Sequence, residues 1–197
     1  MSLNNSQTMQ VFDPFRLAER SFVIKALFAV AGTLVLALAS RIAVPMVPVP
    51  ITMQTFAVTM IGALYGWRLG SLTVLAWVAE GLAGLPVWTN GASGVPYFLG
   101  PTGGYLVSFP LVAMLAGWLA EKGWTGERVI ASFAAHLSAN ILCLAIGGVW
   151  LGAMIGAEKA WLLGVMPFFL GAALKSALAA AVLKGVAIYG GKPQIGA

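Results

Sequence analysis

The stretch LPVWTNGASGVPYFLGPTGGYL, residues 85–106, contains no charged residue, yet it holds three prolines, five glycines and four aromatic residues. Proline and glycine at this density interrupt a helix, so the stretch is predicted to contain a loop. A charge-free loop this rich in aromatic residues is unusual in water. The segments on either side of it therefore decide how it is interpreted.

The composition of the whole chain is typical of a protein embedded in lipid. Apolar residues make up 60% of the 197 residues and charged residues 9%, with a mean hydropathy of +0.92. Soluble domains are nearer about 45–50% and about 25%. The length suits one domain, so we expect a single membrane domain over residues 1–197. The chain has one cysteine, so an internal disulfide is excluded, and no metal site is expected. The net charge of +5 is interpreted through the side of the membrane on which the basic residues lie, and no nucleic-acid partner is expected.

Six apolar segments are separable in the sequence. They cover about residues 22–40, 51–65, 69–84, 102–120, 129–150 and 167–188. Several are at or below the roughly 20 residues that cross a bilayer as a helix, so tilted helices and re-entrant loops are expected. The sequence therefore predicts an all-α membrane protein with six transmembrane helices.

The distribution of basic residues predicts the orientation. With a cytoplasmic N-terminus, the inner side collects eight basic residues: Arg16, Arg20, Lys25, Arg68, Lys122, Arg128, Lys184 and Lys192. The outer side keeps Arg41 and Lys159. Because Lys and Arg concentrate in cytoplasmic loops, both termini are predicted to be cytoplasmic. Residues 1–20 then form a cytoplasmic segment, and residues 85–101 form an extracytoplasmic loop.

Lys175 is the polar residue least expected in lipid. It lies about eight residues inside the sixth apolar segment, where an ammonium group needs an anionic partner. That partner is either a ligand or a carboxylate of the protein, for which Glu80 in the third segment is the candidate. Alternatively, Glu80 lies at the membrane–water interface, or it lines a ligand site itself.

Further polar residues mark other apolar segments. Ser132, His136 and Asn140 share one face of the fifth segment, where they either line a cavity or bond to neighbouring helices. Gln54, at the outer end of the second segment, is able to donate and accept hydrogen bonds toward a ligand. In the first segment, Ala29, Thr33 and Ala37 form a small-residue stripe suited to close approach of another helix, within the bundle or from a partner.

Four motifs carry further information: GLPVW (84–88), GPTGGYL (100–106), VPVPITMQTF (47–56) and PFFLGAALK (167–175). Together they resemble the BioY family, the biotin-binding S components of energy-coupling factor (ECF) vitamin transporters. The resemblance covers about residues 20–190. It implies a six-helix S-component fold in the bacterial cytoplasmic membrane, with biotin held near the outer face under residues 85–101 acting as a lid.

The resemblance also implies site residues and partners. Asn90 and Lys175 match biotin-binding positions of the family, with Gln54 as a third, and an aspartate usually stands where this chain has Ala172. Glu80 or Asn140 is the candidate to compensate, and Trp88 and Tyr105 are expected as aromatic walls. No cofactor is expected. A transmembrane coupling subunit and two ATPase subunits would energise transport, since the sequence has no phosphate-binding G-x-x-x-x-G-K-[ST] motif. Contact through the first-segment stripe, self-association and action without these subunits stay open.

Three other functions are compatible with parts of the sequence, one of them a purely structural membrane subunit in which Lys175 and Glu80 form an internal pair. Gly91-Ala92-Ser93-Gly94 matches the G-x-S-G of rhomboid intramembrane proteases, with His136 as the base for Ser93. Ser93 is followed by Gly94 and then Val95-Pro96 in an outer loop, which is a poor fit to that mechanism. The third alternative is an S component for another vitamin such as riboflavin or thiamine, which the alanine at position 172 leaves open.

Overall fold

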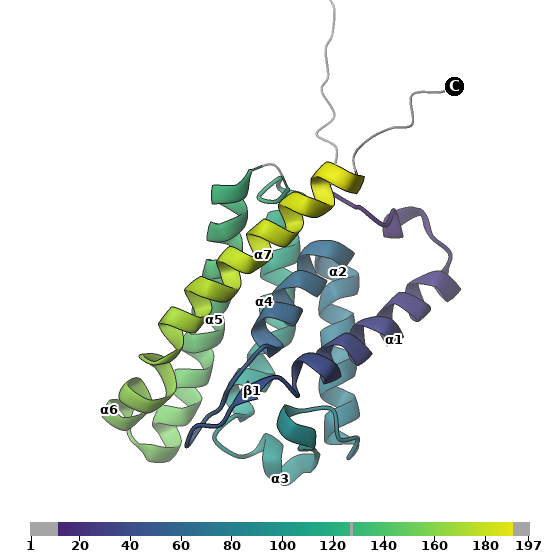
Figure 1. Cartoon of the computed structure of the whole chain (residues 1–197). Coiled ribbons are helices and arrows are strands. Elements are labelled where there is room, and N and C mark those ends of the chain that lie inside the picture. The colour runs from purple at the N-terminus through teal and green to yellow at the C-terminus, as the bar shows by residue number, and fades with distance from the viewer. Residues whose placement is uncertain (1–11, 127, 191–197) are drawn as a thin grey trace, which may run out of the picture.

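The computed structural model describes residues 12–126 and 128–190, which form a helical bundle (Figure 1). Residues 1–11 of the predicted cytoplasmic segment, and Lys192, lie outside this range. The elements are, in chain order, η1 (Leu17–Glu19), α1 (Phe22–Ala39), β1 (Ala43–Val44), β2 (Ile51–Thr52), α2 (Gln54–Leu82), η2 (Thr89–Gly91), α3 (Gly94–Phe98), α4 (Gly103–Glu121), α5 (Val129–Ile155), α6 (Ala157–Ala160), η3 (Trp161–Val165) and α7 (Phe168–Gly190). The strands pair antiparallel, with Ala43 opposite Thr52.

Five helical stretches of the described chain are long and apolar enough to cross a membrane, whereas the sequence predicted six. The difference lies in α2, which contains both the second and the third predicted segments. Gly66 in its middle has a non-helical backbone (φ 77°, ψ 166°). Glycine adopts this positive φ readily, whereas other residues do so unfavourably. A Cβ on Gly70 would lie only 2.9 Å from the Cα of Gly62. The chain therefore folds back on itself at Gly66, as Figure 1 shows.

The two ends of the described chain lie at the same end of the bundle (Figure 1). The hairpin of β1 and β2, the short helix α3 and α6 lie at the opposite end. We call these the terminal end and the hairpin end. The reversal of α2 at Gly66 belongs to the terminal end, and Gln54 begins α2 at the hairpin end.

The core of the bundle is formed by α2 packing against α4. A Cβ on Gly62 would overlap the backbone carbonyl of Ala113, so the two helices approach to backbone contact there. Nearer the hairpin end, the rings of Trp77 and Phe109 stack at 6.0 Å between centroids. Small residues at the crossing allow the dispersion contacts that hold helices together when lipid supplies no hydrophobic driving force.

The small-residue stripe of α1 faces into the bundle. Thr33 is buried, and Ala29 and Ala37 are half-buried. Next to Thr33, a Cβ on Gly32 would meet Thr73 of α2 at 2.6 Å. Gly32 and Thr33 therefore pack against a helix of the same chain. Contact of the half-buried Ala29 and Ala37 with another protein stays a prediction.

Residues 85–101 are more ordered than the loop that the sequence predicted. They contain η2 and α3, and they lie at the hairpin end of the bundle (Figure 1). Three contacts hold the segment to the end of α1. The guanidinium of Arg41 donates to the carbonyl of Pro86 at 2.9 Å and lies against Gly91, and the backbone N–H of Asn90 donates to the backbone carbonyl of Ser40 at 3.3 Å.

Candidate functional site

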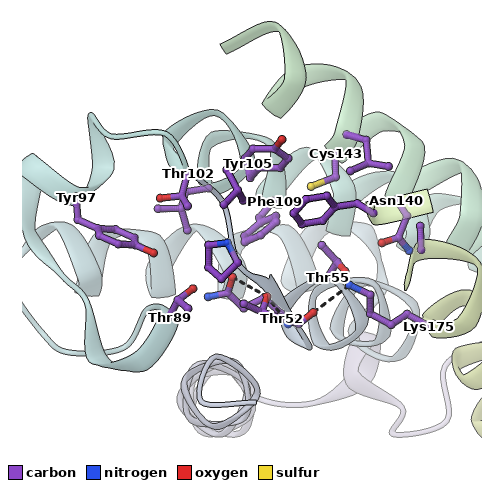
Figure 2. A pocket seen from close by; sticks show the side chains of 17 residues that line it. Thr52, Thr55, Thr89, Tyr97, Thr102, Tyr105, Phe109, Asn140, Cys143 and Lys175 are labelled. Carbon is purple, nitrogen blue, oxygen red and sulfur yellow. Dashed lines mark hydrogen bonds between the residues drawn. The ribbon is translucent and has the colours of Figure 1, made fainter. Parts of the chain in front are cut away.

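A pocket lies between the helices near the hairpin end, and Figure 2 shows the side chains around it. Its lining comes from the β2–α2 junction, the 89–102 segment, α4, α5 and α7. The residues are Val49, Pro50, Thr52, Gln54, Thr55, Thr89, Tyr97, Thr102, Tyr105, Leu106, Phe109, Asn140, Cys143, Leu144, Phe168, Ala172 and Lys175. Its volume is about 50 Å³, which is room for a few water molecules.

Lys175 reaches the pocket from α7 and is half-buried. Its Nζ donates to the carbonyl oxygen of Thr52 at 2.9 Å and to Oγ1 of Thr55 at 2.8 Å. Both acceptors are neutral, so these bonds leave the positive charge unneutralised. An ammonium has three N–H donors, and two of them are used here. One donor and the whole charge are therefore available to a molecule in the pocket.

Gln54 lies at the first turn of α2 and is buried at the pocket wall. Its Nε2 donates to Oγ of Ser40 at 2.9 Å, and its Oε1 accepts from Oγ1 of Thr52 at 3.1 Å. Ser40 donates its own hydroxyl proton to the carbonyl of Leu36. The amide is thus tied to the end of α1, and its oxygen keeps one lone pair free.

Tyr105 and Asn140 line the pocket from α4 and α5. The Tyr105 hydroxyl donates to the carbonyl of Gly164 at 2.6 Å, and its ring stacks on Phe168 at 6.2 Å. Its hydroxyl is therefore already used, and the ring is what it offers to the pocket. The Nδ2 of Asn140 donates to the carbonyl of His136 at 2.9 Å and to Oγ of Ser176 at 3.3 Å.

Three of the predicted site residues lie outside the pocket lining. Trp88 is fully buried behind it, where its ring stacks on Tyr97 at 5.7 Å. Asn90 is exposed and lines a neighbouring groove, which shares Tyr97 with the pocket. Glu80 is half-buried on the second arm of α2 and is not part of the lining. The nitrogen of Lys175 bonds to threonines rather than to Glu80.

Several lining residues had no signal in the sequence. Thr52 and Thr55 flank Gln54 and hold Lys175, but threonine is a common residue at a helix start. Cys143 lines the pocket, and its Sγ lies 3.3 Å from Oγ of Ser108. Phe109 and Phe168 are apolar residues in apolar helices. The fold alone brings them to the site.

The serine–histidine pair of the protease alternative is not supported by the structure. Ser93 directly precedes α3 at the hairpin end. His136 is buried on α5, two turns from the terminal end of that helix. Nδ1 of His136 has no hydrogen-bond partner among the described residues. The two side chains therefore lie toward opposite ends of the bundle, too far apart for a proton transfer.

A lysine, two carboxamides and several aromatic rings line a cavity between helices that are apolar enough to cross a membrane, which is typical of a membrane protein with a candidate site for a small molecule. The model of the BioY family matches residues 8–190, so the chain belongs to the BioY family.

Individual relatives agree with this assignment. The probable biotin transporter BioY of Pyrococcus horikoshii is 36% identical over 140 residues, which is 71% of this chain and 82% of the relative. The biotin transporter BioY of Rhizobium etli is 34% identical over 187 residues, which is 91% of this chain and 98% of the relative. The crystal structure of an S-component for biotin from an ECF-type ABC transporter superposes with a TM-score of 0.73 at 26% identity, covering 83% of this chain and 90% of that one.

Proposed function

We propose that this protein binds biotin and is the substrate-binding S component for biotin uptake by an ECF-type transporter. The observation that carries the proposal is Lys175, an ammonium group held at a pocket between membrane helices with no acidic residue in the pocket lining. Membership of the BioY family and the likeness to an S-component for biotin support the same function.

The chemistry of the pocket suits biotin. Biotin has an apolar bicycle and chain, a ureido group that donates and accepts hydrogen bonds, and one carboxylate. The lining supplies aromatic rings from Tyr97, Tyr105, Phe109 and Phe168, and a few polar groups. Pockets for ligands of this size are usually about 300–1,000 Å³. Because the cavity is about 50 Å³, we expect the 89–102 segment and the hairpin to move outward when biotin enters.

The placement of charges supports a bacterial cytoplasmic-membrane protein with cytoplasmic termini. Arg16 and Arg20 flank η1, Arg68 follows the reversal at Gly66, and Lys122 and Arg128 lie in the connection between α4 and α5. These segments belong to the terminal end. The hairpin end, with Arg41 and Lys159, would face outward. The pocket would then take biotin from outside the cell.

ATP hydrolysis is assigned to partner subunits in this proposal, a transmembrane coupling subunit and two ATPases. Contact of α1 with the coupling subunit is proposed at the stripe of Ala29, Thr33 and Ala37, of which the two alanines are half-buried and Thr33 is buried. Leu27 and Leu34 are also exposed on α1.

Equilibrium binding to the purified protein tests the proposed function. We expect biotin to saturate a single site and to change tryptophan fluorescence, because Trp88 stacks on the pocket residue Tyr97. Desthiobiotin and biotin amide are titrated in parallel. Their affinities relative to biotin measure how much the thioether ring and the carboxylate contribute to binding. Riboflavin and thiamine test the other vitamins. Absence of biotin binding from nanomolar to micromolar concentrations would exclude this function.

Replacing Tyr105 with phenylalanine is expected to lower stability by about 1 kcal/mol, since the bond to the Gly164 carbonyl is lost in a buried place. Biotin affinity should change by less than about threefold, because the hydroxyl is not available to the ligand. Thermal unfolding in detergent and biotin titration measure the two effects. A large loss of affinity in a stable Tyr105→Phe protein would show that the hydroxyl changes partner when biotin binds.

A further inference from the structure

The amide of Asn140 has a fixed polarity. Its Nδ2 donates to the backbone carbonyl of His136 and to Oγ of Ser176. A backbone carbonyl only accepts hydrogen bonds, so the nitrogen, and not the oxygen, of the amide must face His136. Both N–H donors of Asn140 are therefore used inside the protein.

Ser176 reinforces this polarity from α7. It is fully buried, and its hydroxyl proton goes to the carbonyl of Ala172 at 2.7 Å. With its proton committed there, the Oγ of Ser176 meets Asn140 as an acceptor. Reversal of the amide would place its oxygen against two acceptors, which is unfavourable in a buried site.

The oxygen of Asn140 is left for the pocket. Asn140 is part of the lining, and within residues 12–126 and 128–190 no hydrogen bond reaches its Oδ1. Figure 2 shows Asn140 at the same end of the pocket as Lys175 and Thr55, with Tyr97 and Thr89 at the other end. This end thus offers one acceptor, the Asn140 oxygen, beside one remaining donor of Lys175.

We infer that the Oδ1 of Asn140 accepts a ureido N–H of biotin, and that Ser176 is the positioning residue that keeps this oxygen turned toward the ligand. The inference rests on the proposed function. A ureido group has an N–H beside a carbonyl oxygen, which complements an acceptor beside an ammonium. A carboxylate has only acceptors, and one oxygen would face the Asn140 oxygen unfavourably. The carboxylate therefore lies toward Tyr97 and Thr89.

The test measures the binding affinities of biotin and of two derivatives, each methylated at one ureido nitrogen. The proteins compared are the wild type, Asn140→Ala and Ser176→Ala. Asn140→Ala should weaken biotin about 5- to 100-fold, because a ligand N–H is left unpaired. The derivative methylated at the nitrogen that faces Asn140 should bind Asn140→Ala less than about threefold more weakly than it binds the wild type. Ser176→Ala should weaken biotin binding about 3- to 10-fold, again with a smaller effect on the derivative methylated at the nitrogen that faces Asn140.

Two controls separate this role from a structural one. Ser71→Ala removes a hydroxyl that likewise donates to a carbonyl four residues earlier, at 2.6 Å, but outside the pocket, and should leave biotin affinity unchanged. The double variant of Asn140 and Ser176 should bind within about twofold of Asn140→Ala alone, since the serine acts through the asparagine.

Equal losses for biotin and both derivatives in Asn140→Ala, or unchanged biotin affinity in that folded variant, would overturn the inference while leaving biotin binding intact. A wild-type protein that binds no biotin would overturn the proposed function together with the inference.

Discussion

Replacing Lys175 with methionine is expected to weaken biotin binding by about ten- to a hundredfold. A hydrogen bond from a charged donor is worth roughly 1.5–3 kcal/mol when water is excluded, and methionine keeps the apolar length of the side chain. The empty protein also loses the bonds from Lys175 to Thr52 and Thr55. Biotin titration followed by tryptophan fluorescence measures the change in affinity.

Lys184→Met is the matched control for this prediction. Lys184 lies on the same helix, is exposed, and is not part of the pocket lining. Its removal deletes the same charge from the same helix and should leave the affinity as it is. If Lys175→Met retained wild-type affinity in a protein that elutes and melts normally, Lys175 would have no part in binding biotin.

Replacing Gly62 with alanine is expected to lower the free energy of unfolding by about 3 kcal/mol, at the upper end of the usual effect of overpacking. The new Cβ would overlap the carbonyl of Ala113, which is backbone and cannot move without shifting α4. A change of this size corresponds to a melting temperature about 6–12 °C lower for a chain of this length. Thermal unfolding in one detergent measures it.

The control for Gly62 is Gly185→Ala on α7. A Cβ at position 185 would meet nothing within 4 Å. Alanine is also the better helix former by about 1 kcal/mol, so this variant should be neutral or slightly more stable. A Gly62→Ala protein as stable as wild type would mean that α2 and α4 are able to separate at their crossing without cost.

Apolar runs and glycine positions were enough to predict most of the helices. The segments around 22–40 and 129–150 correspond to α1 and α5 because the lipid requires long uninterrupted runs. The turn between the second and third predicted segments appears as the reversal at Gly66. The inward direction of Thr33 was not predictable, because a stripe of small residues suits a helix of the same chain as well as one from another protein.

The site was predictable where a residue was chemically out of place and, for Tyr105, through the resemblance to the family. Lys175, Gln54 and Asn140 are polar in apolar surroundings, and all three line the pocket. Trp88 and Asn90 follow the recognised GLPV motif but lie behind the pocket and in the neighbouring groove. Their positions depend on how residues 85–101 fold over the bundle, which no local pattern encodes. Whether they contact biotin stays a prediction.

The reversal of α2 at Gly66 has a consequence for the surrounding lipid. The arm over residues 54–65 rises only about 18 Å, at about 1.5 Å per residue, against a hydrocarbon thickness of about 30 Å. Gln54 would then lie well below the headgroups, with the strand pair filling the remaining depth. If the strand pair moved away, the short arm would leave a hydrophobic mismatch, which local thinning of the bilayer relieves. The acyl-chain length of the host membrane would thus influence how readily the hairpin moves aside.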